Sequence, residues 1–203
     1  MRRALYTPKM IFVLRCACIG IGVILIILGI VLKTQGYSSS EYYYNGKVRV
    51  SLVVECRGDA MLQEAIATKQ RLNIVFPRNA AAEESVSKAL RSGMEVVLQQ
   101  GNISYEQVWV SGAKGILVDG ETGDAAPAEG KYFFSLKEGG TALSPDFVVL
   151  GTEDEARVIM SQAVEYLGSN GNAIVYYREG CGLPLSAVID MLQGANFTLL
   201  SQY

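Results

Sequence analysis

Residues 16–32, CACIGIGVILIILGIVL, contain no charged side chain and are almost entirely apolar. Residues 10–14 extend this stretch, and Arg15 is its single charged interruption. A helix rises about 1.5 Å per residue, so residues 10–32 match the roughly 30 Å hydrocarbon core of a bilayer. Arg15 lies near one end, where a long basic side chain reaches the headgroups. The sequence therefore predicts one transmembrane helix, residues 10–32, embedded in the lipid bilayer.

Basic residues around this stretch predict its orientation. Arg2, Arg3, Lys9 and Arg15 precede its apolar centre, whereas Lys33 alone follows closely. Because positive side chains favour the cytoplasmic side, we expect the N-terminus in the cytoplasm. The chain is then a single-pass protein of the inner (cytoplasmic) membrane.

This orientation divides the chain into four parts. Residues 1–9 form a cytoplasmic N-terminus, residues 10–32 the helix, residues 33–46 a polar linker, and residues 47–203 a periplasmic or extracellular domain. A cleaved signal peptide is the alternative, although its apolar region usually covers about 7 to 15 residues before a small-residue cleavage site. Here the apolar stretch is longer and LKTQGYSSSEYYY follows it, which favours an uncleaved anchor.

Short β-branched runs alternate with amphipathic stretches from Lys47 onward, a pattern typical of an α/β domain with a mostly parallel sheet. We expect strands at residues 48–55, 72–76, 95–99, 115–119, 132–136, 147–150, 173–177 and 197–201. Helices are expected at residues 60–69, 81–91, 153–167 and 184–192. Thr152 and Glu155 predict a capping box at the third helix. Helix C-caps are predicted at Gly93, Gly168, Gly171 and Gly194.

The chain has no histidine, and its formal net charge is -2 without a dense basic run. The missing histidine excludes Ser-His-Asp triads, Cys-His pairs and zinc sites with His ligands. The missing basic run excludes nucleic acid as a partner, because binding to it needs clustered cations. Any catalysis must use carboxylates, Cys, Lys or Tyr.

Three stretches carry a family resemblance: VRVSLVVECRG (48–58), LNIVFPRNAAAEESVSKALRSGMEVVLQQ (72–100) and FVVLGTEDEARVIMSQAVEYLGSNGNAIVYYREG (147–180). In order and spacing they resemble the divergent polysaccharide deacetylase family. The resemblance implies an incomplete or distorted (β/α) barrel that removes acetyl groups from envelope sugars with a divalent metal. It also implies a site at the C-terminal ends of the strands.

The metal-binding residues of that family are missing. Where the family has two acidic residues, this chain has Glu55 and Cys56; where it has histidines, this chain has Met94, Gln99 and Arg178. A catalytic zinc usually has three protein ligands, which a single carboxylate does not supply. The resemblance therefore implies a degenerate member, a pseudoenzyme with no metal and no cofactor.

The candidate site residues lie at or just after predicted strand ends, which a parallel sheet brings to one edge. Glu55 and Asp119 are the catalytic candidates, as an acid/base pair. Alternatively, they are solvated carboxylates or partners of Arg57 and Arg178. The remaining members form a binding rim at that edge: Cys56, Gln99, Arg178, Glu179 and Cys181, with Glu121 nearby.

Two further features leave alternatives open. Cys56 and Cys181 are either a disulfide across the rim, a reactive thiol, or two inert buried thiols. Tyr105, Trp109, Tyr176 and Tyr177 either stack on sugar rings or pack in the core.

Three functions follow for this envelope domain. The leading hypothesis is a membrane-anchored, catalytically inactive deacetylase-like domain that binds an envelope glycan or an envelope protein. The second is an active carbohydrate deacetylase or hydrolase that uses Glu55 and Asp119 with an oxygen-ligated metal such as Mg or Ca. The third is an unrelated α/β protein of envelope assembly.

Overall fold

The computed structural model describes residues 48–77, 83–99, 112–118, 131–138 and 140–203. All of them belong to one compact unit, Tyr42–Tyr203. The predicted transmembrane helix and linker lie outside the described residues, as do Asp119, Glu121, Tyr105 and Trp109. Within the described ranges, no helix has the length and apolar character that a membrane span requires.

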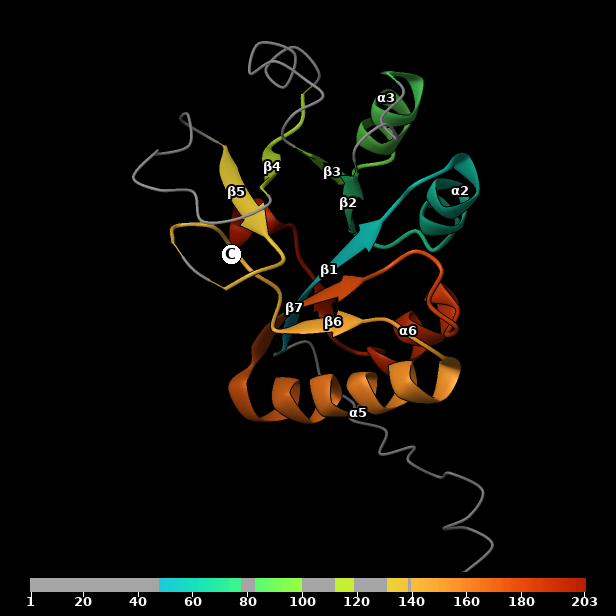
Figure 1. Ribbon diagram of the computed structural model, residues 1–203, viewed down its shortest axis with the longest axis vertical. Helices are drawn as coiled ribbons and strands as arrows, with labels where there is room; N and C mark the ends of the chain where they lie inside the picture. Colours follow the sequence, from blue (N-terminus) through green and yellow to red (C-terminus); the bar gives the residue numbers. More distant parts are fainter. Residues whose placement is uncertain (1–47, 78–82, 100–111, 119–130, 139) are drawn as a thin grey trace, which may run out of the picture. The chain divides into compact units, whose positions relative to one another are not determined.

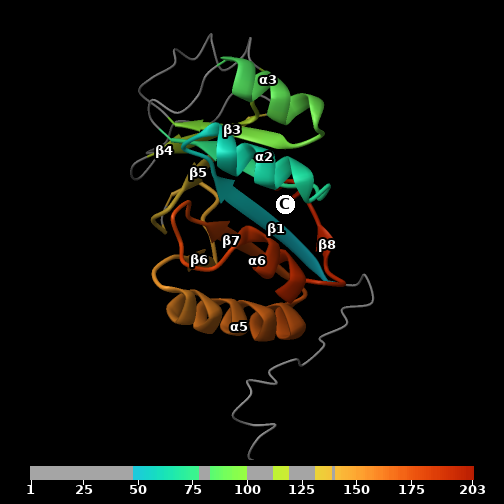
Figure 2. The same ribbon diagram turned by 90° about the vertical axis from the view of Figure 1, so that its right-hand side faces the viewer.

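The described strands form one sheet in the order β5-β4-β3-β2-β1-β7-β6, with β8 paired beside β1 (Figures 1 and 2). All strand pairs given for this sheet are parallel. The bounds of the strands are β1 Arg49–Glu55, β2 Asn73–Phe76, β3 Glu95–Gln99, β4 Gly115–Val118, β5 Tyr132–Ser135, β6 Phe147–Val149, β7 Asn172–Tyr177 and β8 Asn196–Phe197. The α/β class with mostly parallel strands, predicted from the sequence, is confirmed.

Helices connect these parallel strands and pack along the sheet (Figures 1 and 2). Their bounds are α2 Asp59–Ala67, α3 Glu83–Arg91, α5 Glu153–Asn170 and α6 Leu185–Met191, followed by the short 3₁₀ helix η1, Leu200–Gln202. Helices α2 and α3 contact each other, and α5 contacts β6, β7 and α6. The predicted helices are thus present, with ends shifted by at most three residues where both ends are described.

Side chains alternate between two faces of each strand and so form two separate cores. On β1, Val50, Leu52 and Val54 pack in an outer core together with residues of the helices. Val53 lies on the other face, in an inner core with Val75 and neighbouring strand residues. Because both faces are covered, the strands are almost continuously apolar, as parallel strands usually are.

The sheet curls into an incomplete barrel rather than closing. The two edge strands of the ladder, β5 and β6, are consecutive in the sequence and do not pair with each other. The connection between them adds one parallel bridge, Leu143 with Phe134, beside β5. Leu143 also packs against the inner core. The concave face is therefore partly covered by this connection.

The C-terminal segment closes the amino end of this half-barrel. The side-chain amide of Asn73 donates to the carbonyls of Leu52 (3.2 Å) and Thr198 (3.3 Å), and its oxygen accepts from the backbone N–H of Leu200 (2.8 Å). Leu200 is buried in the inner core. We call residues 198–202 the C-terminal plug.

A second buried polar side chain holds the same plug. Glu95, 3% exposed, accepts from the backbone N–H of Ser201 (2.9 Å), from the Ser201 hydroxyl, and from the Tyr132 hydroxyl (2.7 Å). These side-chain bonds explain why the predicted strand at residues 197–201 is wrong beyond Phe197. The backbone N–H of Thr198 still donates to the Val50 carbonyl of β1 (2.9 Å), but those of Leu200 and Ser201 bind side chains of β2 and β3 instead of extending the strand ladder.

The ends of α5 follow local rules with one correction. Thr152 and Glu155 form the predicted capping box, with the Thr152 backbone N–H donating to Glu155 Oε2 (2.8 Å). The predicted cap at Gly168 is wrong, because the helix continues to Asn170. It ends at Gly171, whose φ of 81° is the left-handed conformation that favours glycine.

Candidate functional site

Parallel strands place their carboxyl ends at one edge of the sheet, and a cavity of about 420 Å³ lies there. Its lining comes from β1, β3, β4, β5 and β7 and from residues that directly follow strands. The lining residues are Glu55, Arg57, Pro77, Gln99, Leu117, Val118, Ser135, Leu136, Lys137, Tyr176 and Arg178. We call this the carboxyl-end pocket.

Glu55 is the single carboxylate among the described lining residues and is only 4% exposed. Arg57 Nε donates to its Oε1 at 2.7 Å, and Arg178 Nε lies 3.8 Å from its Oε2. The side chain of Tyr176 also forms a hydrogen bond with Glu55. The carboxylate is therefore held by two cations and a hydroxyl, which is the ion-pair alternative left open by the sequence.

The pKa values of the neighbours reflect this arrangement. Burial raises the pKa of Tyr176 well above its ordinary value, and the charge and hydrogen bond of Glu55 raise it further. The hydrogen bond and charge of Glu55 raise the pKa of the Arg57 guanidinium. Tyr176 is thus a neutral hydrogen-bond donor at physiological pH, and Arg57 is a permanent cation.

Positive charge dominates the described lining. Arg57, Lys137 and Arg178 line the same pocket as one carboxylate, that of Glu55. The side chains of Arg57 and Arg178 are 55% and 54% exposed although both contact Glu55. A ligand entering from solvent therefore meets accessible cations before it meets the buried carboxylate.

Glu179 positions the segment after β1 without lining the pocket. Its carboxylate accepts a hydrogen bond from the backbone N–H of Arg57. This contact ties the residues that follow β7 to those that follow β1, so that Arg57 and Arg178 flank the same carboxylate.

Apolar and small polar side chains complete the pocket. Leu117 and Val118 of β4 are buried at its wall, and Leu136, 46% exposed, lies at its opening after β5. Ser135 Oγ accepts from the backbone N–H of Lys137 (3.1 Å), which fixes the turn that carries this lysine. The pocket thus combines a charged side with an apolar wall.

The two cysteines lie away from this pocket. Strand alternation puts Glu55 on the inner face and Cys56 on the outer face, where Cys56 is fully buried in the outer core. Burial raises the pKa of the Cys56 thiol, followed by the charges of Glu179 and Glu55. Cys181 packs beside the outer core, and its Sγ accepts from the backbone N–H of Leu183. Both are free cysteines, so the structure has no disulfide at the rim.

The aromatic candidates also separate by face. Tyr177 points to the outer core, where its hydroxyl donates to the carbonyl of Leu183 (2.8 Å), and burial raises its pKa to about 12. Tyr176 stacks on Phe134 in the inner core, with ring centroids 6.1 Å apart. Of these two tyrosines, only Tyr176 reaches the pocket.

Sequence reasoning placed Glu55, Gln99 and Arg178 at this edge, and the structure brings all three into the pocket. It did not propose Lys137 or Ser135. The rule that selected the others, position at or just after a strand end, also applies to these two residues of the β5 turn. Leu117 could not be found by this rule, because nothing in the sequence distinguishes this apolar strand residue from a residue of the core.

The donor set does not fit the divalent metal that the family resemblance implies. In the described ranges, no group of three or more Cys, Asp or Glu side chains is placed to hold a metal ion. The carboxylate in the pocket is flanked by two guanidinium groups, which repel a divalent cation. No catalytic step through a metal follows from these residues.

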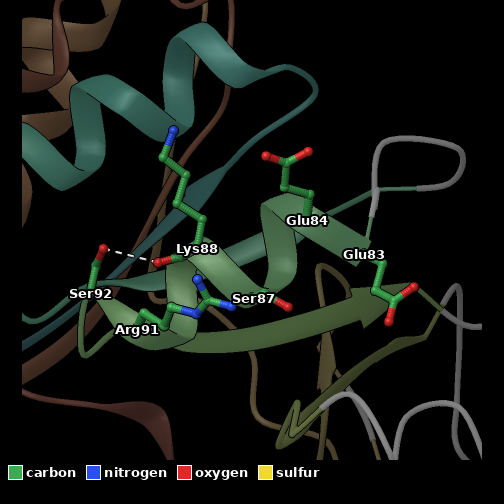
Figure 3. A pocket seen from close by; sticks show the side chains of 6 residues that line it. All are labelled: Glu83, Glu84, Ser87, Lys88, Arg91 and Ser92. Carbon is green, nitrogen blue, oxygen red and sulfur yellow. Dashed lines mark hydrogen bonds between the residues drawn. The ribbon is translucent and has the colours of Figure 1, made fainter.

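A second hollow, of about 720 Å³, lies on α3 and the turn after it. Figure 3 shows its side chains spreading outward from one helix instead of converging on a point. The lining residues are Glu83, Glu84, Ser87, Lys88, Arg91 and Ser92. The acidic pair lies in the first turn and the basic residues near the last, as the helix dipole favours. This is the solvated face of an amphipathic helix.

The fold and site define an α/β half-barrel with a cationic pocket at the carboxyl ends of its strands. No protein-family model matches the sequence, and no curated protein matches it. A solved structure, that of an uncharacterized protein from Agrobacterium tumefaciens, is similar in fold. It is 14% identical, with a TM-score of 0.51 over 77% of this chain and 89% of that chain. At this identity the likeness shows the fold alone.

Proposed function

We propose that this chain is a membrane-anchored, divergent polysaccharide deacetylase-like domain of the cell envelope that binds a glycan or protein partner without catalysis. The main support for the proposal is the set of side chains around Glu55. This carboxylate lies at the strand end where the resemblance implies a metal ligand. It is engaged by Arg57, Arg178 and Tyr176.

Catalysis by Glu55 needs a carboxylate that accepts a proton or a metal. Here Oε1 accepts from Arg57 at 2.7 Å, and Arg178 approaches Oε2. Both carboxylate oxygens thus already face guanidinium groups of the protein, which leaves them less available to a substrate. The same cations disfavour a metal. The arrangement therefore supports binding over hydrolysis.

The membrane anchor is the second part of the proposal and rests on the sequence of residues 10–32. Full-length protein is expected in the membrane pellet after alkaline extraction. Protease added outside sealed spheroplasts is expected to digest residues 47–203 and spare an N-terminal tag. Release of a shortened, soluble chain would show the cleaved signal peptide instead.

Enzyme assays test the absence of catalysis. Full-length protein in detergent micelles is incubated with acetylated chitooligosaccharides and with peptidoglycan fragments, with and without added divalent metal. We expect no acetate above the buffer background and the same result for Glu55→Gln. Acetate release by the native chain that disappears in Glu55→Gln would show the enzyme alternative to be correct.

A further inference from the structure

We propose that the carboxyl-end pocket binds an acidic sugar, a glycan unit that carries a carboxylate, and recognises the acid group through Arg178, Arg57 and Lys137. This inference rests on the proposed function, because it names the ligand class of the same pocket. It goes beyond that function in predicting which glycans bind and which do not.

The charge of the pocket is the first step. The described lining residues include three cations and one carboxylate, so this part of the lining carries an excess of positive charge. One cation would be enough to neutralise the buried carboxylate of Glu55. Arg57 also interacts with the charge of Glu179, which does not line the pocket, and an anionic ligand would balance the positive charge that Glu55 leaves over among the described lining residues.

Accessibility of the guanidinium groups is the second step. Arg57 and Arg178 are each about half exposed, at 55% and 54%, while the carboxylate between them is almost fully buried. Both arginines approach Glu55 through Nε. A guanidinium has five N–H donors in a planar fork that fits a carboxylate, so an Nε contact leaves most of this donor set for a ligand. Glu55 thereby fixes the orientation of both arginines.

The apolar wall is the third step and favours a sugar over a small inorganic anion. Leu117, Leu136 and Pro77 line the same cavity as the cations. A sugar ring presents both C–H faces and hydroxyls, so it fits a pocket with an apolar wall that is also lined by the hydroxyl-bearing side chains of Ser135 and Tyr176. The volume of about 420 Å³ is within the roughly 300 to 1,000 Å³ of small-molecule sites.

The experiment uses two ligands with the same sugar rings, one with charged carboxylates and one with these groups neutralised as methyl esters. Full-length protein in detergent micelles is titrated calorimetrically with trigalacturonic acid and with its methyl ester, which keeps the rings and removes the charges. We expect the acid to bind at least tenfold more tightly than the ester. Its affinity is expected to fall as NaCl is raised, because salt screens accessible charges.

Matched variants assign the effect to the pocket. Arg178→Gln is expected to weaken binding of the acid at least tenfold and to leave binding of the ester unchanged. Arg91→Gln makes the same change of charge on the solvated face of α3 and is expected to leave both affinities unchanged. Equal weakening by both variants would show that overall charge, and not this pocket, attracts the acid.

Other outcomes overturn the inference in distinct ways. Equal binding of acid and ester would overturn it and leave the proposed binding function intact. If glucose 6-phosphate bound tenfold more tightly than galacturonic acid, the inference would be wrong about the acid group, and the pocket would be a site for sugar phosphates. Release of acetate in the enzyme assay would overturn the absence of catalysis while leaving the preference for acidic sugars standing.

Discussion

The two ends of the half-barrel each hold a buried carboxylate on the inner face, and these carboxylates have opposite surroundings. Glu95, at the amino end, is enclosed by Tyr132 and by Ser201 of the C-terminal plug. Glu55, at the carboxyl end, is held by two arginines that remain half exposed. One end is closed by the chain itself, and the other is open to solvent.

This difference separates a structural role from a binding role. At the amino end, the polar groups find their partners within the protein, so their hydrogen bonds contribute to folding stability. At the carboxyl end, accessible cations outnumber the described carboxylate, so their charges are available to a ligand. Variants at the amino end should therefore lower stability, while variants at the carboxyl end should lower binding.

The largest effect is expected at Asn73, which makes three hydrogen bonds at the closed end. Asn73→Ala should lower the free energy of unfolding by about 3 kcal/mol, because it leaves buried backbone groups without partners. Urea denaturation of the full chain in detergent, followed by near-ultraviolet circular dichroism, measures this. Asn170→Ala, at the exposed end of α5, removes one hydrogen bond and is the control, with a loss below about 1 kcal/mol. Equal losses of unfolding free energy in the two variants would show that the plug contacts of Asn73 contribute no more than a surface hydrogen bond.

The two carboxylates themselves provide the next comparison. Glu95→Gln should lower the free energy of unfolding by about 2 kcal/mol, because an amide cannot accept on both of its terminal atoms from Tyr132 and Ser201. Glu55→Gln should lower it by about 1 kcal/mol, because its arginine partners are half exposed and solvated. The same denaturation experiment ranks them. A larger loss for Glu55→Gln would reverse the roles assigned to the two ends.

Alkaline pH should act on the closed end. Burial, followed by the charge and hydrogen bond of Glu95, raises the pKa of Tyr132 above its ordinary value of 10.0. Its contribution to stability is therefore complete below pH 10.0 and is lost as pH rises above this value, because the unfolded chain releases the proton first.

Tyr132→Phe tests this titration. Above pH 10.0, the free energy of unfolding of the native chain should fall as pH rises. Removing the titrating group should make this slope shallower by up to about 1.4 kcal/mol per pH unit. The hydrogen bond to Glu95 is also lost, so stability at neutral pH should fall by about 1 kcal/mol. An unchanged slope in denaturation experiments between neutral and alkaline pH would contradict this role of Tyr132.

The smallest change in stability is expected at the open end. Arg57→Gln should alter the free energy of unfolding by only about 0.5 kcal/mol, because Arg57 is itself half exposed and Arg178 remains beside the Glu55 carboxylate. The same variant should weaken binding of trigalacturonic acid at least tenfold. A large loss of stability with unchanged binding would assign Arg57 to the structure and not to the ligand.

Much of this fold could be predicted because its determinants are local. The β-branched runs that become β3 and β7, and the Thr152–Glu155 capping box, are visible within a few residues of sequence. The alternation of side chains also separates Glu55 from Cys56 without a structure. Had that rule been applied, Cys56 would have been placed in the outer core and not on the rim.

The C-terminal plug could not be predicted in this way. Residues 198–201 contain strand-forming side chains, but their conformation is set by Asn73 and Glu95, which lie more than a hundred positions earlier in the chain. The pocket shows this limit in part. The sequence offered Arg178 as one possible partner of Glu55, but choosing that alternative depends on the contact between β1 and the segment after β7, which no local pattern contains.

The pairing of β1 has a consequence for the order in which the molecule is built. This first strand forms its ladder with β7 on one side and shares its other side between β2 and β8. Its partners are thus both the next strand and two late ones, so β1 can pair with β2 early but completes its ladder only when β7 and β8 are available. Closing so long a loop is slow. The pairing of β1 with β7 should accordingly be one of the later steps of folding, so the middle of the sheet is completed after its β1–β2 portion.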